Sequence, residues 1–191
     1  MNQHLQRMKN AIAGYHGKAR AAEAEIERAY TLYQREPAER EEQRIRDRLA
    51  KERKAAENEI NAACNAALEG VKAWGTLDGS RMTDDVKLFD VGLTPEQFNG
   101  LVDKYQDNYT MLNALIRYAD NANREAAKDA HGIPTTRFST AAIPTPEAKT
   151  AQWERIYNGA CSMLDTLEKG DPFAKSLADA GVEHWGENVD I

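Results

Sequence analysis

The chain has 191 residues, of which 29% are charged and only 7% are aromatic, and its formal net charge is −6. This composition is typical of an elongated helical protein rather than of a compact enzyme. Residues 1–77 contain 14 Lys/Arg and 12 Asp/Glu, whereas residues 78–191 contain 11 and 19. Because an acidic half repels nucleic acid, we expect no nucleic-acid partner.

A heptad pattern of apolar and small residues runs through residues 3–35. Its members follow one another at alternating spacings of three and four: Leu5, Met8, Ile12, Tyr15, Ala19, Ala22, Ile26, Ala29 and Tyr33. A repeat averaging 3.5 residues forms one narrow stripe on an α-helix, and such a stripe is buried most easily against another helix. The pattern therefore predicts a long helix that pairs with a second helix.

A second stripe continues over residues 38–74. It consists of Ile45, Leu49, Ala56, Ile60, Ala63, Ala67, Val71 and Trp74, and Arg53 also falls on it. Pro37 separates the two stretches and either starts a helix or kinks one. The matched lengths favour an antiparallel hairpin, but no Gly or Asn marks a turn. A single kinked helix that pairs with another chain therefore remains open.

The two stripes together predict a self-association seam. We assign to it the larger side chains of both stretches: Leu5, Met8, Ile12, Tyr15, Ile26, Tyr33, Ile45, Leu49 and Ile60. Residues 35–59 contain eight basic and eight acidic side chains, with favourable i,i+4 pairs at Glu36–Arg40, Glu42–Arg46 and Asp47–Lys51. These interleaved charges predict a solvated helix face rather than a basic patch for nucleic acid.

Helix-starting signals recur after the turn-rich segment 76–80. Thr83 precedes a short predicted helix that ends near Gly92, and Thr94-Pro95-Glu96-Gln97 combines a cap, a first-position proline and a capping box. Asn108 is placed to cap a helix that runs to about residue 128. A loop is expected over residues 131–144, before another helix begins at Thr145-Pro146.

The predicted helix after Pro146 buries Trp153, Ile156, Tyr157, Ala160, Leu164 and Leu167 and stops at Gly170, and a last short helix ends at Gly181. We therefore expect an all-α fold with a long N-terminal helical arm, a coiled coil or an antiparallel hairpin, and a small C-terminal helical unit. The predicted domains are a coiled-coil arm over residues 1–75, a linker over 76–81 and a small acidic helical domain over 82–191.

The sequence contains no recognisable catalytic or ligand motif. The four histidines lack a His or Cys partner at i+3 or i+4, and no phosphate-binding glycine loop or nucleophile elbow occurs. We therefore expect a non-enzymatic protein with no catalytic residue, metal, cofactor or small-molecule substrate. Cys64 and Cys161 form no C-x-x-C pair. Without a signal peptide or a long apolar run, no membrane association and a cytoplasmic location are expected.

The order of elements and several short motifs resemble uncharacterised coiled-coil proteins of phages and prophages of Gram-positive bacteria. The likeness rests on Leu77-Asp78-Gly79-Ser80, Asp85-Val86-Lys87-Leu88, Leu93-Thr94-Pro95-Glu96-Gln97-Phe98, Asn108-Tyr109-Thr110-Met111 and Tyr118-Ala119. The resemblance implies a role in virion assembly, as a capsid scaffolding protein or a capsid-associated factor. It further implies a location in the cytoplasm of the bacterial host, the procapsid or the virion.

Two functions follow as expectations. The first is a homo-oligomeric phage assembly protein that binds a structural protein, the major capsid protein, without catalysis. The alternative is a coiled-coil adaptor or regulator that binds another host or phage protein.

Overall fold

A computed structural model describes residues 2–129, 137–169, 172–182 and 184–185. Within these residues the fold is all-α and contains no strand, which confirms the expected fold class. The elements are α1 (Gln3–Leu32), α2 (Arg35–Gly75), the 3₁₀ turns η1 (Gly79–Arg81) and η2 (Asp84–Lys87), α3 (Leu88–Val91), α4 (Pro95–Lys104), α5 (Tyr109–Asp129), α6 (Pro146–Lys169) and α7 (Pro172–Val182). The chain divides into a first unit, Met1–Leu68 with Ala151–Ile191, and a second unit, Glu69–Thr150.

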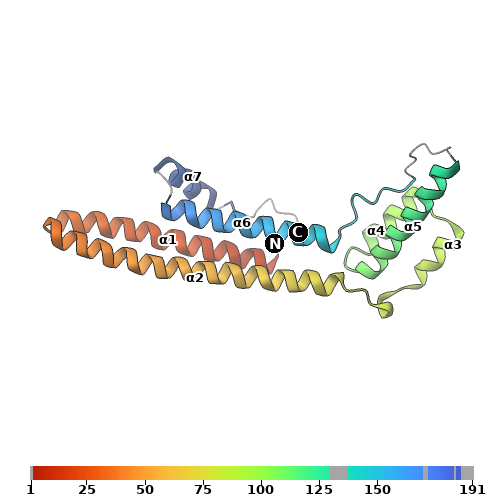
Figure 1. Cartoon of the computed structure of the whole chain (residues 1–191), viewed down its shortest axis with the longest axis horizontal. Helices are drawn as coiled ribbons and strands as arrows, with labels where there is room; N and C mark the ends of the chain where they lie inside the picture. The colour runs from red at the N-terminus through yellow and green to blue at the C-terminus, as the bar shows by residue number, and fades with distance from the viewer. Residues whose placement is uncertain (1, 130–136, 170–171, 183, 186–191) are drawn as a thin grey trace. The chain divides into compact units, whose positions relative to one another are not determined.

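Helices α1 and α2 form an antiparallel hairpin, as Figure 1 shows. Four polar contacts join the two helices: Arg7–Glu59 (2.8 Å), Lys18–Glu52 (2.5 Å), Glu25–Arg48 (2.5 Å) and Tyr30–Glu42 (2.6 Å). The residue numbers rise along α1 and fall along α2, so the two helices are antiparallel. The hairpin alternative is therefore confirmed over the single kinked helix. The stripes of the two stretches face each other within one chain.

The hairpin turns without glycine because two residues suffice. Tyr33 ends α1 with an extended backbone, and the carbonyl of Gln34 accepts the first hydrogen bond of α2 from the Ala38 amide at 3.1 Å. Pro37 lies in the first turn of α2, where its missing N–H has no intrahelical acceptor to lose. The proline therefore favours the start of α2 instead of kinking a longer helix.

Helix α6 adds a third helix to the first unit. Trp153 is buried and makes an edge-on ring contact with His4 at 6.2 Å between centroids. The rest of its buried face consists of Ile156, Ala160, Leu164 and Leu167. Helix α7 packs on α1, where Lys175 pairs with Glu23 at 2.5 Å. Helices of the same chain thus cover part of the apolar stripe of the hairpin.

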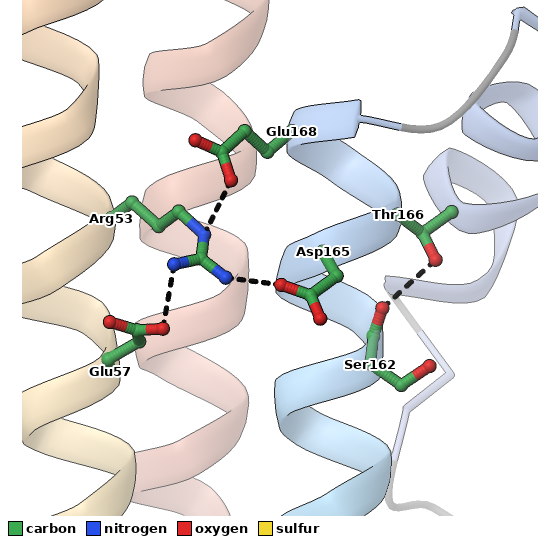
Figure 2. A network of polar contacts seen from close by, with 6 residues as sticks. All are labelled: Arg53, Glu57, Ser162, Asp165, Thr166 and Glu168. Atoms are coloured by element: carbon green, nitrogen blue, oxygen red, sulfur yellow. Dashed lines mark hydrogen bonds and ion pairs between the residues drawn. The ribbon is translucent and has the colours of Figure 1, made fainter.

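Arg53 fixes the end of α6 to the hairpin (Figure 2). Its guanidinium lies 2.7 Å from the Glu57 carboxylate and 2.9 Å from that of Glu168, and it also pairs with Asp165. Burial disfavours its charge, but Glu168, Glu57 and Asp165 outweigh this effect and raise the pKa of Arg53. The arginine that interrupts the apolar stripe therefore meets carboxylates of α6.

The expected domain boundaries differ from this arrangement. The linker over 76–81 and the acidic domain over 82–191 would separate α6 and α7 from the arm over 1–75, whereas both helices pack in the first unit. The physical reason is the apolar face of α6, which fills the third position beside the hairpin. Sequence order alone does not reveal this packing, because residues 69–150 intervene.

The second unit has its own core around α4 and α5. The predicted capping box is present: the Thr94 side chain accepts from the Gln97 amide, and the Gln97 side chain accepts from the Thr94 amide. The core consists of Leu93, Phe98, Leu101, Val102, Tyr105, Met111, Leu112, Leu115, Ala119, Phe138 and Ile143.

The segment that follows α5 is joined to the core through Asn123. The Asn123 side chain accepts from the amides of Arg137 and Phe138 and donates to the Phe138 carbonyl, at 2.7–2.9 Å. Phe138 packs against Phe98 with ring centroids 5.0 Å apart. Phe138 and Ile143 of the predicted loop therefore have a packing role, while its residues 131–136 lie outside the described residues.

Candidate protein-binding groove

Residues 77–91, which we call the strap, run alongside α5 and are attached to it at their beginning. The Asp78 amide donates to the Thr110 hydroxyl at 3.0 Å, and Thr110 is the one polar residue among the buried side chains described. Arg81 donates to the Asp107 carbonyl at 2.5 Å, and the Asn108 side chain donates to the Arg81 carbonyl at 2.8 Å. These bonds hold η1 against the start of α5.

A second attachment joins the middle of the strap to α4. The Thr83 hydroxyl lies 2.7 Å from the Tyr105 hydroxyl, which donates to the Asp85 carboxylate at 2.7 Å. Lys104 lies 2.7 Å from the same carboxylate. Hydrogen bonds from Lys104 and then Tyr105 lower the pKa of Asp85. The Thr83 side chain makes no capping hydrogen bond, because its hydroxyl meets Tyr105 instead.

A largely apolar groove of about 620 Å³ lies between the strap and α5. The strap contributes Leu77, Gly79, Met82, Val86, Phe89 and Asp90, and α5 contributes Thr110, Asn113, Ala114, Arg117, Tyr118 and Asn121. The α5 residues recur at spacings of three and four, so they share one helical face. We call this site the α3–α5 groove.

The groove continues as a second hollow on the other side of Phe89. This hollow measures about 400 Å³ and follows the same face of α5 through Ala122, Glu125 and Ala126. Residues 110–126 of α5 span about 24 Å at 1.5 Å per residue. The concave surface is therefore as long as several turns of helix.

Large apolar side chains are exposed around the groove. Leu77 and Met82, both in its lining, are 52% and 47% exposed, and Leu88 and Val91 are exposed on α3. Leu88 and Val91 also line a smaller hollow of about 230 Å³. Clustered exposed apolar side chains next to a concave surface mark an interaction site, whereas single ones do not.

Two opposite charges stand on the two walls of the groove. Asp90 belongs to α3 and Arg117 to α5, and neither makes an ion pair with another described residue. Asn113, one turn before Arg117 on α5, adds an amide to the lining. An apolar groove with a few converging polar groups suits a ligand that buries an apolar face and carries charges at its edges. An amphipathic helix laid along α5 has this character.

Most of the predicted seam is buried inside one chain. Leu5, Met8, Ile12, Tyr15, Ile45 and Ile60 are buried, Ile26 and Leu49 are half-buried, and Tyr33 is exposed. The buried six meet helices of their own chain. The other three lie toward the turn of the hairpin.

The sequence prediction missed the α3–α5 groove. It treated Leu77 as part of a linker and assigned no binding role to the helix that begins after Asn108. A detectable signal was the group of apolar residues Leu77, Met82 and Val86 in a segment otherwise rich in turn-forming residues. The position of these side chains over α5 depended on the path of the strap, which follows from long-range hydrogen bonds such as Asp78 to Thr110.

Within the described ranges, no group of three or more His, Cys, Asp or Glu side chains is arranged to hold a metal ion. Both cysteines are free thiols, and burial, followed by the nearby Cys161, raises the pKa of Cys64. None of the described helices is long and apolar enough to span a membrane.

Comparison of the chain with protein-family models, with curated proteins and with solved structures finds no match.

Proposed function

We propose that this chain is a non-catalytic assembly protein that binds an apolar helical segment of a structural protein in the α3–α5 groove. The observation that carries the proposal is the alignment of exposed apolar strap residues, Leu77 and Met82, with one face of α5. A partner helix that lies along α5 would cover these side chains and remove them from water.

The resemblance to coiled-coil phage proteins supplies the partner class. On that basis the partner is a phage structural protein, the major capsid protein, and the site of action is the host cytoplasm or the procapsid. An open groove supports modest affinity, because its walls remain partly exposed to water. Modest affinity suits an assembly factor that must bind and later release many subunits.

The test is co-expression of the chain with the major capsid protein encoded in the same phage or prophage genome. We expect the two proteins to co-purify, and we expect shell yield or shell size to change when this chain is omitted. Unchanged shells together with no co-purification at low salt would contradict capsid assembly. An adaptor role for another host or phage protein would then replace it.

The groove itself is tested with the double variant Leu77→Glu/Met82→Glu. Both side chains are about half exposed, so the fold should tolerate them while binding of the capsid protein is lost. Leu177→Glu is the matched control, because Leu177 is equally exposed but lies on α7 in the first unit. Loss of binding in the control, or retention in the groove variant, would argue against this site.

A further inference from the structure

The face of the hairpin that α6 covers continues beyond α6 without a third helix. Figure 1 shows the turn of the α1–α2 hairpin extending well past α6 and α7. Arg53 meets Asp165 and Glu168 near the end of α6, and residues 38–52 of α2 run from there toward the turn. At 1.5 Å per residue this extension is about 22 Å long.

Helical register places one set of side chains on the continued face. Tyr15 is buried near Glu168 of α6, and Ile26 and Tyr30 follow it at 11 and 15 residues, which keeps them on the same side of α1, while Tyr33 stands at the C-terminal end of that helix. On α2, Leu49 lies one turn before Arg53. Ile26 and Leu49 are half-buried, and Tyr30 and Tyr33 are exposed. We call these four residues the distal patch.

The hairpin has little large apolar content of its own in this region. The side chains buried between its helices toward the turn are Ala22, Ala29, Ala38 and Ile45, of which only Ile45 is large. Near its other end, by contrast, Trp153 and Leu164 of α6 contribute large side chains. The distal hairpin therefore lacks the third layer that completes the bundle elsewhere.

The net charge of the distal hairpin, residues 26–49, favours a second copy of the chain as the partner. Residues 26–49 contain six arginines and six Asp/Glu, so their net charge is zero, and the rest of the chain carries the whole −6. Two copies repel each other through their other surfaces but meet without net repulsion here. Five of the six arginines already pair with carboxylates of their own chain, and a surface balanced in this way gives no attraction to a strongly acidic or basic partner.

We propose that the distal patches of two copies pack against each other across a two-fold axis and form a short four-helix bundle. Each patch then fills the position that α6 occupies in the other part of the hairpin. Such an isologous contact uses the same residues on both chains. The distal patch and the α3–α5 groove have no residue in common, so the two contacts can be changed independently by substitution.

The test is sedimentation of the full chain from low to high micromolar concentration. We expect the weight-average mass to rise from that of a monomer toward twice that value. Tyr33→Glu should raise the dissociation constant about tenfold, because it places a charge in the contact. Leu32→Glu is the matched control: Leu32 is 62% exposed and Tyr33 54%, but Leu32 lies off the patch face.

Three outcomes would overturn the dimer: a monomer at every concentration, a dimer unaffected by Tyr33→Glu, or equal weakening by both substitutions. Circular dichroism of each variant verifies that the helices are intact. The groove variant Leu77→Glu/Met82→Glu should dimerise normally, and Tyr33→Glu should still bind the capsid protein. Failure of the dimer and failure of the proposed groove function are therefore distinguishable.

Discussion

Replacing Arg53 with alanine should loosen α6 from the hairpin. The side chain is 20% exposed and contacts three carboxylates, two of which belong to α6. In the Arg53→Ala variant, Glu57, Asp165 and Glu168 remain close together without a counter-charge, which adds repulsion to the lost ion pairs.

The loss in the free energy of unfolding depends on how exposed the three carboxylates that pair with Arg53 are. A fully exposed pair contributes about 0.2–1 kcal/mol, and removal of one partner from a fully buried pair costs about 3–5 kcal/mol. The carboxylates of Glu57 and Glu168 are about one third exposed and that of Asp165 more than half. We therefore expect a loss of about 2 kcal/mol in the free energy of unfolding. For a chain of this length, the midpoint of thermal unfolding should fall by about 4–8 °C.

The assay is urea unfolding followed by circular dichroism, together with hydrogen exchange of the α6 amides. Arg53→Lys keeps the charge but loses the planar fork, so it should cost about half as much. Arg44→Ala is the control, because Arg44 is exposed and pairs only with Glu41 on its own helix. A cost for Arg53→Ala no larger than for Arg44→Ala, with unchanged protection of α6, would refute the reasoning.

Three further predictions concern single side chains. Gly75→Ala should destabilise the chain by about 1–3 kcal/mol in thermal unfolding, because the new Cβ would lie 2.6 Å from Pro146 Cγ; Gly70→Ala, which meets open space, should not. Thr110→Val should lower the free energy of unfolding by about 1–2 kcal/mol, because it leaves the Asp78 amide without its acceptor. Thr110→Ser keeps the hydroxyl and should retain most of the stability. Burial of Tyr15, followed by Glu168, raises its pKa to about 12 from 10.0. Wild-type stability is therefore unaffected by this group below pH 10 and falls by about 2–3 kcal/mol as the pH rises through 12, whereas the stability of Tyr15→Phe in urea should not change with this titration. At neutral pH the variant should be at least as stable as wild type, because the buried Tyr15 hydroxyl has no hydrogen-bond partner among the described residues.

Local signals predicted the helices well. The capping box at Thr94 and the cap at Asn108, whose side chain accepts from the Met111 amide, lie where the sequence places them. Helix α2 ends at Gly75, as expected. Two of three predicted i,i+4 pairs form, Glu36–Arg40 and Glu42–Arg46, whereas Asp47 accepts from Gln43. Such features depend on residues within one turn, so sequence suffices for them.

Pairing between distant segments was not determined by these signals. The heptads required a partner helix but did not identify it, because a hairpin and a second chain bury the same stripe equally well. The two-residue turn at Tyr33 and Gln34 and the packing of the third helix, α6, show that the hairpin forms within one chain. In the sequence Arg53 interrupts the apolar stripe, and only the structure shows that Asp165 and Glu168 of α6 pair with it.

The sequence by itself determined the helical fold class, the helix starts and the need for helix pairing, because period and capping act through neighbours in the chain. Only the tertiary structure shows which helices pair, where the strap lies on α5 and which seam residues stay exposed. Tyr15 and Tyr33 share one heptad stripe, yet Tyr15 is buried and Tyr33 is exposed. Their difference arises from the length of α6, which covers one and ends before the other.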